Sequence, residues 1–189
     1  MKIMALSGSP RRGGNTETLL DRFTMGARSA GAKVTKIRVC DLKIAPCREC
    51  SGCARAGVCV IKDDMAKLAR RLLKADKIVV AAPIFFYGLP AQLKAVVDRS
   101  QALWERRRLS SSPLRTPVGV FVLLAGATRG RRLFEGSLLT LRYFAQSFNG
   151  CLSGKLLVRG VDKAGDISFR SDLIDAAFEA GREFVRPRR

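Results

Sequence analysis

The sequence predicts an α/β fold: a doubly wound, five-stranded parallel sheet with helices on both faces. Strand-like and helix-like patterns alternate five times along the 189 residues. The segment 78–82 is continuously apolar, as strands buried on both faces of a parallel sheet are. A chain of this length suits one domain with one core, so we expect residues 1–189 to form a single domain.

The first elements follow from the hydrophobic period. Residues 2–6 form a short apolar strand candidate. A helix is expected to begin at Asn15, because apolar residues recur at near-helical spacing until Gly31 ends the pattern. Residues 34–39 alternate between apolar and polar side chains and predict the second strand.

The later elements continue the same alternation. Asp63 or Asp64 is expected to cap a helix, and 78–82 is the third strand. Pro90 opens a helix whose apolar positions continue as far as Trp104. The remaining elements are two strands and two helices, at 118–124 and 156–161, and around 138–148 and 173–185.

Four of the six cysteines stand in one run with the spacing C-x2-C-x2-C-x5-C, namely Cys47, Cys50, Cys53 and Cys59. The first three match the rhythm of loops that bind cubane clusters. The sequence therefore favours an iron-sulfur cluster in a loop at about 41–62. Two alternatives stay open: structural zinc, which usually draws its ligands from two separate knuckles, and a metal-free loop with ordinary or redox-active thiols.

The composition excludes several other kinds of metal site. The chain has no histidine, which excludes His-containing zinc, copper and non-haem iron sites and Rieske-type clusters. Cys40 and Cys151 fall outside the spacing and lie beside or inside apolar stretches. We predict that both are buried small hydrophobic residues rather than ligands.

The chain is strongly basic, with 35 Lys and Arg against 16 Asp and Glu and a net charge of +19. The basic residues are spread along the chain without a nucleic-acid-binding motif, so a basic nucleic-acid-binding protein with a structural metal loop is only a remote alternative. An acidic electron carrier suits the charge equally well. With no signal-like or membrane-spanning apolar run, we expect a cytoplasmic protein that does not bind membranes.

The loop after the first strand, residues 7–16, combines glycines, hydroxyls and two arginines at a helix N-terminus. Backbone N–H groups, hydroxyl donors and the positive helix end together suit a phosphate. A Walker A loop would need a lysine, and Pro10 takes the place of the second glycine of a dinucleotide fingerprint. The loop therefore favours a mononucleotide with one terminal phosphate; the alternative is a plain turn with capping hydroxyls.

Two further loops are expected beside this one, because ligands of doubly wound sheets lie beyond the carboxyl ends of the strands. Residues 83–88 carry three consecutive aromatic side chains, which suit the border of a flat conjugated ring. Residues 125–128 are small and allow a ligand to approach. The alternative for the aromatic rings is packing in the core or at a dimer interface.

These motifs resemble the flavodoxin-like NADPH-dependent FMN reductases, and within them the iron-sulfur flavoproteins of anaerobic prokaryotes. The resemblance covers roughly the first 130 residues, and beyond them only the alternation of strand and helix continues it. It is carried by Gly8-Ser-Pro-Arg11 with Gly14-Asn-Thr16, Cys59-Val-Ile-Lys-Asp-Asp-Met65, Ala82-Pro83, Tyr87-Gly88, Gln92-Leu-Lys94 and Val97-Asp-Arg99.

The resemblance implies a flavodoxin-like sheet, bound FMN and a [4Fe-4S] cluster ligated by the four cysteines of the run. It implies no catalytic side chain, because the flavin N5 carries the chemistry. The FMN contacts expected at the phosphate end are Ser7, Ser9, Pro10, Arg11, Asn15 and Thr16. Those expected around the ring and ribityl chain are Pro83, Ile84, Phe85, Phe86, Tyr87, Gly88, Ala125 and Gly126.

The expected function is an electron relay. A cluster passes single electrons and a flavin holds one or two, so the pair would take electrons from ferredoxin or a similar acidic carrier and deliver them to a small-molecule acceptor. The resemblance also implies a homodimer or homotetramer. The alternative is an NAD(P)H-dependent FMN or quinone reductase without a cluster, with NAD(P)H as the electron donor.

Overall fold

A computed structural model describes residues 1–111 and 116–186, and places five parallel strands in one sheet. The strands are β1 (Lys2–Ser7), β2 (Lys33–Arg38), β3 (Lys77–Pro83), β4 (Val118–Gly126) and β5 (Gly150–Arg159). Their order across the sheet is β2-β1-β3-β4-β5, and all neighbours are parallel. This is the flavodoxin-like order, so the predicted fold is confirmed.

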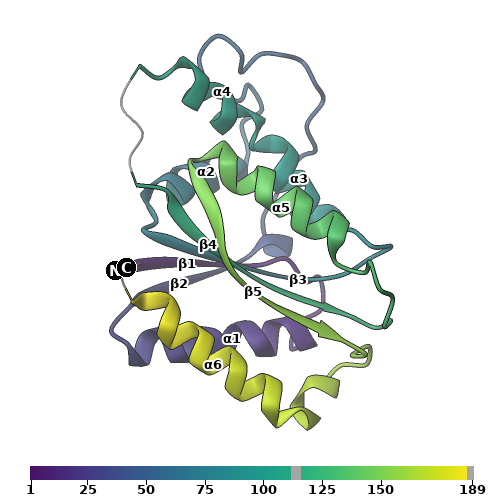
Figure 1. Cartoon of the computed structure of the whole chain (residues 1–189). Coiled ribbons are helices and arrows are strands. Elements are labelled where there is room, and N and C mark those ends of the chain that lie inside the picture. The colour runs from purple at the N-terminus through teal and green to yellow at the C-terminus, as the bar shows by residue number, and fades with distance from the viewer. Residues whose placement is uncertain (112–115, 187–189) are drawn as a thin grey trace.

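Helices cover both faces of the sheet (Figure 1). One layer consists of α1 (Asn15–Ser29) and α6 (Ser171–Val185). The other contains α2 (Asp64–Lys74), α3 (Ala91–Arg99) and α5 (Glu135–Ser147), with α4 (Gln101–Leu109) following α3. Two short 3₁₀ turns complete the described elements, η1 (Val39–Asp41) and η2 (Asp166–Phe169). None of the described helices is long and apolar enough to cross a bilayer.

Alternate residues of the inner strands supply the two halves of the core. In β3, Ile78 and Val80 pack with the α2, α3 and α5 layer, whereas Val79 and Ala81 pack with the α1 and α6 layer. All four are 0–1% exposed. Side chains of successive strand residues point to opposite faces, so a strand covered on both sides must be apolar throughout. This is why the continuous run at 78–82 marks a central strand.

The α1 and α6 helices approach each other closely through two glycines. A Cβ on Gly26 would lie 1.9 Å from the carbonyl oxygen of Phe178, and a Cβ on Gly181 would lie 2.0 Å from that of Phe23. Only glycine permits this backbone contact. The two helices therefore form one tightly packed layer beneath the sheet.

Three boundaries test the sequence predictions. Asp63 caps α2, because its Oδ1 accepts a hydrogen bond from the Met65 N–H at 3.0 Å. The helix that opens after Pro90 is interrupted at Ser100, whose hydroxyl donates to the Val96 carbonyl at 2.9 Å, and continues as α4. The fifth strand begins at Gly150 rather than at 156, because pairing with β4 recruits the polar stretch that precedes the apolar residues.

Candidate functional site

The loop after β1 lies at the carboxyl edge of the sheet and is fixed to its neighbours. The Gly8 N–H donates to the Ala81 carbonyl of β3 at 2.7 Å. A Cβ on Gly8 would lie 2.7 Å from a methyl carbon of Leu93 and 3.3 Å from the Ala81 carbonyl oxygen, so the loop packs tightly against α3 and β3 here. Ser7 is 1% exposed, and its hydroxyl has no hydrogen-bond partner among the described residues. A buried hydroxyl without a partner at this edge fits a ligand that the chain itself does not supply.

The first turn of α1 leaves backbone donors at the same place. Gly14 caps the helix without a side chain, and the Glu17 and Thr18 amides both donate to its carbonyl. The Asn15 and Thr16 amides belong to the group that every helix leaves without an intrahelical acceptor. The positive end of the helix dipole adds to these donors. The donor set therefore fits the phosphate of FMN.

Glu17, which sequence analysis did not single out, supports this loop from below. Its carboxylate accepts hydrogen bonds from the Gly13 N–H at 2.8 Å and from Arg38 at 2.7 Å, and pairs with Lys36 at 2.9 Å. Burial raises its pKa, but these hydrogen bonds prevail and lower the pKa of Glu17 to about 2. Glu17 therefore stays ionised and holds Gly13, which has a positive φ of 63°, in its turn.

Asn15 and Arg11 connect the loop to the segment after β5. The Asn15 side-chain amide donates to the Lys163 carbonyl at 2.9 Å and accepts from the Ile167 N–H at 3.2 Å. The Arg11 guanidinium donates to the Asp162 carbonyl at 2.9 Å. Both side chains were predicted to hold phosphate directly. In the structure they hold the 162–167 segment against the loop at residues 7–16, called the phosphate loop below. This role depends on the tertiary fold.

Ser9, Pro10 and Thr16 complete the loop. The Ser9 hydroxyl bonds both the carbonyl and the N–H of Arg11, at 3.1 and 3.2 Å, and so fixes the turn. Ser9 and Thr16 are each 3% exposed, whereas Pro10 is exposed. All six predicted phosphate-end residues thus share this loop and helix turn. Their contact with FMN stays a prediction.

The aromatic loop after β3 is a tight, strained turn. Phe85 and Gly88 exchange two backbone hydrogen bonds, of 3.0 and 2.9 Å, around Phe86 and Tyr87. These two central residues have positive φ values of 48° and 60°. Bulky side chains rarely adopt this conformation, and such strain collects at ligand sites. Phe86 is fully exposed and the rings of Phe85 and Tyr87 are half-exposed, so none of them is core packing.

The loops after β3 and β4 meet beside this turn. The Ile84 N–H donates to the Ala125 carbonyl at 2.8 Å, and Pro83 pairs with Ala125 in the sheet. A Cβ on Gly126 would lie 3.4 Å from Cβ of Ile84. The structure thus brings together, at one edge of the sheet, the three loops that the sequence assigned to the flavin.

The cysteine loop leaves the sheet after η1 and runs beside α4 before it returns to α2 (Figure 1). Its four cysteines line one pocket of about 1000 Å³, which is closed on the other side by residues of α3, α4 and α5, among them Trp104 and Tyr143. Cys47 and Cys50 are exposed, and Cys53 and Cys59 are half-buried. Within 1–111 and 116–186, no group of side chains stands in a geometry that could hold a metal ion.

The thiols differ in acidity. The Gly52 N–H and the Arg48 side chain lower the pKa of the Cys50 thiol, which favours the thiolate that binds metals. Burial raises the pKa of Cys53, and the neighbouring charges of Cys59, Glu105 and Cys47 add to the rise. Four thiols are the type of ligand that an iron-sulfur cluster needs, but they do not yet stand in ligand geometry.

The two remaining cysteines, which were predicted to be buried residues rather than ligands, do not line this pocket. Cys40 is in η1 and Cys151 is in β5, and both are half-buried rather than fully buried. Burial raises the pKa of Cys40. Each lies at the margin of the core, because η1 follows an edge strand and β5 is itself an edge strand.

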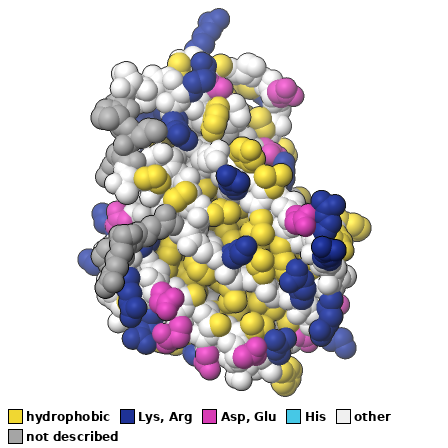
Figure 2. Space-filling model, viewed as in Figure 1, with side chains coloured by type: hydrophobic (Ala, Val, Ile, Leu, Met, Phe, Trp, Pro, Cys, Tyr) yellow, Lys and Arg dark blue, Asp and Glu magenta, His cyan; other side chains and the backbone are white. Residues whose placement is uncertain are grey.

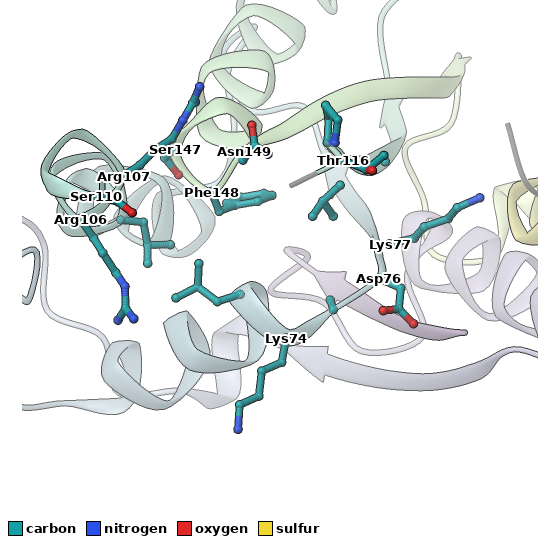
Figure 3. Close-up of a pocket in the computed structure, with 16 residues that line it drawn as sticks. Lys74, Asp76, Lys77, Arg106, Arg107, Ser110, Thr116, Ser147, Phe148 and Asn149 are labelled. Carbon is teal, nitrogen blue, oxygen red and sulfur yellow. The ribbon is translucent and has the colours of Figure 1, made fainter. Parts of the chain in front are cut away.

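A second cavity, of about 630 Å³, lies at the opposite, amino edge of the strands, where Lys77, Thr116 and Asn149 line it (Figure 3). None of the predicted site residues lines this cavity. Basic side chains are scattered over the face seen in Figure 2, and hydrophobic ones gather between the two helix layers, along the open edge of the sheet. On this face no single basic stripe suggests a nucleic-acid groove.

Comparison with known proteins agrees with this geometry. The family described as NADPH-dependent FMN reductase matches residues 1–147. The chain is 36% identical over 130 residues to an iron-sulfur flavoprotein of Methanosarcina thermophila, a match covering 69% of this chain and 66% of that protein. It is 31% identical over 147 residues to an iron-sulfur flavoprotein of Methanocaldococcus jannaschii, a match covering 76% of this chain and 70% of the relative.

A solved structure supports the fold alone. The NAD(P)H:quinone oxidoreductase from Methanothermobacter marburgensis superposes with a TM-score of 0.74 at 19% identity, over 100% of this chain and 99% of that one. The chain matches 66%, 53% and 45% of the lengths of three curated iron-sulfur flavoproteins, so it spans about half to two thirds of them. The match over residues 1–147 shows that the chain belongs to the NADPH-dependent FMN reductase family of flavin-dependent oxidoreductases, within which it is similar to the iron-sulfur flavoproteins.

Proposed function

We propose that this chain is a single-domain, cytoplasmic FMN protein that also carries a [4Fe-4S] cluster and acts in electron transfer. The cluster would be ligated by Cys47, Cys50, Cys53 and Cys59. It would accept single electrons, and FMN would pass them on to a small-molecule acceptor. The observation that carries this proposal is that the four spaced cysteines, and neither of the other two, line one pocket.

Both candidate sites lie against the same helix, α5. The Tyr87 carbonyl lies 3.1 Å from where a Cβ on Gly136, in the first turn of α5, would stand. Two turns further along α5, Tyr143 lines the cysteine pocket. Seven residues of helix span about 10 Å. This arrangement supports electron transfer between a cluster and a flavin within one subunit.

The electron donor is proposed to be ferredoxin or a similar acidic carrier. A net charge of +19 favours encounter with an acidic protein, because complementary fields raise association rates. The exposed rings of Phe86 and Tyr143, which are 106% and 60% accessible, are apolar surface that association of subunits would cover. A homodimer or homotetramer is therefore part of the proposal.

One anaerobic preparation tests the cofactor content. Iron, acid-labile sulfide, zinc and extractable FMN are measured on the same protein, together with its absorption spectrum. About four irons and four sulfides with one FMN per chain are expected. Zinc in place of iron, or iron without FMN, would contradict the proposal. Reduction of the flavin by a reduced ferredoxin, and not by NADPH alone, then tests the direction of electron flow.

A second function, favoured by the exposure of Cys47 and Cys50, is an NAD(P)H-dependent reductase of FMN or quinones without a cluster. Relatives with related names include a putative NAD(P)H-dependent FMN-containing oxidoreductase of Bacillus subtilis, 25% identical over 160 residues. Rapid bleaching of bound flavin by NADPH, in anaerobic protein free of iron and sulfide, would establish this function instead.

A further inference from the structure

The two ends of the cysteine loop meet at a closed neck. The Lys43 N–H donates to the Asp64 carboxylate at 2.8 Å, and the Asp64 N–H returns a bond to the Lys43 carbonyl at 3.2 Å. One step further into the loop, the Ala45 N–H donates to the Asp63 carboxylate at 3.0 Å. The loop is therefore closed at its base although its tip is exposed.

One side chain, Arg99, spans this neck. It is the last residue of α3 and is 2% exposed. Its guanidinium bonds both Asp63 oxygens, at 2.7 and 3.0 Å. It also donates to the Ala45 carbonyl at 2.8 Å on one side of the neck and to the Ile61 carbonyl at 3.2 Å on the other. Both ends of the loop are thus held by one planar fork.

No other side-chain type matches this arrangement. Four acceptors lie around one buried group, and a lysine ammonium offers three donors from a single point, whereas the guanidinium offers five in a plane. The C-terminal end of α3, where carbonyl groups gather, favours a cation. Arg99 and Asp63 also neutralise each other. Removing one of them alone would leave the other as a buried charge without a partner.

Arg99 also lies beside the metal-ligand candidates. Its bonded acceptor Ile61 is two residues after Cys59, and its neighbour Ser100 lines the cysteine pocket. The Nε of Arg99 is buried and has no hydrogen-bond partner among the described residues. Burial lowers the pKa of Arg99, but its hydrogen bonds with Asp63 prevail and the pKa is raised above its ordinary value, so the guanidinium stays charged.

We propose that Arg99 is a positioning residue for the metal centre: it keeps the neck of the cysteine loop closed, so that the four thiols line the pocket before a cluster binds. The identity of the cluster rests on the proposed function. Closure of the neck does not, because it is a property of the metal-free chain.

Two variants and one matched control test this inference. Arg99→Lys keeps the charge and loses the fork. The double variant Asp63→Asn with Arg99→Met removes both charges, so no unpaired charge destabilises the protein. The control, Arg38→Lys, weakens another buried Arg–carboxylate pair, which joins Arg38 to Glu17 beside the phosphate loop.

The first measurement is hydrogen exchange of the reduced, metal-free proteins. In both Arg99 variants the amides of 43–63 are expected to exchange at least about tenfold faster, while the central strands stay protected. The control is expected to leave 43–63 unchanged and to speed exchange around Gly13. Unchanged protection of 43–63 in the folded double variant overturns the inference, whether or not the wild-type protein ever binds iron.

The second measurement is release of iron from the loaded proteins to a chelator. Both Arg99 variants are expected to release iron at least about tenfold faster with FMN content unchanged, and lysine is expected not to rescue. A merely structural role would lower the melting temperature and release FMN in parallel, and that result contradicts the inference. Iron release at the wild-type rate contradicts it too. A wild-type protein without iron refutes the proposed function, and the exchange experiment then decides this inference alone.

Discussion

The phosphate loop and the cysteine loop are both held by a buried arginine–carboxylate pair, but at different places. Glu17, paired with Arg38, bonds the Gly13 N–H inside the phosphate loop itself. Asp63, paired with Arg99, bonds the base of the cysteine loop and caps α2. The first loop is therefore held from within, whereas the second is held at its neck and its tip lies exposed beside α4.

The burial of the ligand candidates follows the same division. Ser7, Ser9 and Thr16 are 1–3% exposed, whereas Cys47 and Cys50 lie exposed at the tip of their loop. A preformed loop loses little entropy when it binds phosphate. A loop whose thiols are not yet in ligand geometry must gain order from the metal centre itself. FMN should therefore bind to a loop that the fold has already shaped. The tip of the cysteine loop, in contrast, should become ordered only when the cluster binds.

The largest difference between the two loops is expected in the cofactor content of Cys50→Ser. Loss of one thiolate should abolish stoichiometric cluster binding, while FMN content stays unchanged because none of the predicted phosphate-end residues lines the cysteine pocket. Iron, sulfide and FMN per chain are the measurement, with Cys40→Ser as the control that keeps both cofactors. Loss of FMN alone from Cys50→Ser would contradict the separation of the two sites.

Acid titration of Glu17 tests how far the phosphate loop depends on its internal carboxylate. Its folded pKa of about 2 lies below the ordinary 4.5, so ionised Glu17 stabilises the fold above about pH 4.5, and this stabilisation is lost as the pH falls toward 2. We expect Glu17→Gln to lower the free energy of unfolding by up to about 3 kcal/mol at pH 7, and by progressively less below pH 4.5. Urea unfolding of the metal-free protein from pH 7 to pH 3 measures this.

The matched control for that experiment is Glu179→Gln. Glu179 pairs with Arg182 on the surface of α6 and should contribute less than about 1 kcal/mol at any pH. Equal losses for the two variants, or a Glu17→Gln loss that does not change with pH, would show that the buried network does not stabilise the loop.

A smaller effect is expected from Asn15→Ala, which cuts two hydrogen bonds between α1 and the 163–167 segment. Each bond contributes about 1 kcal/mol, so FMN affinity should fall by about tenfold or somewhat more, with iron content kept. Fluorescence titration of the apoprotein with FMN measures the change. Thr18→Ala is the control, because the Thr18 hydroxyl reaches only the Gly14 carbonyl, at 3.4 Å. Loss of iron from Asn15→Ala would contradict the independence of the loops.

The smallest effect concerns the strained turn that borders the proposed flavin site. Phe86→Asn and Phe86→Ala both remove the ring, but asparagine tolerates the positive φ of 48° better. The Asn variant should therefore be more stable than the Ala variant by about 1 kcal/mol, while neither changes iron content. Denaturant midpoints of the apoproteins decide this; equal stability would mean that the turn relaxes when the ring is lost.

Sequence patterns predicted what depends on local order. Strand period, the Asp63 cap and the loops at the carboxyl edge all follow from neighbouring residues, and the structure agrees. The early start of β5 did not follow, because Gly150 to Lys155 become a strand only through pairing with β4. The contacts of Arg99 at the neck of the cysteine loop could not be predicted either, because its partners lie 36 to 54 positions away along the chain.

The same limit applies to Asn15 and Arg11. Both are polar residues at a helix start, where a phosphate contact or a cap is the local expectation. Their partners within the chain, at 162–167, are about 150 positions away and lie beside them because β5 ends at the same edge as β1. Long-range contacts of this kind have no periodic signature.

The glycine contact between α1 and α6 has a mechanical meaning for the flavin site. With Gly26 and Gly181 at backbone distance, α1 cannot shift sideways unless α6 moves with it. The first turn of α1 is proposed to face the phosphate, and α1 is thus held in place by its contact with α6. Fusions or cleavage near residue 186 would act on nucleotide binding from the far end of that helix pair, without touching the loop itself.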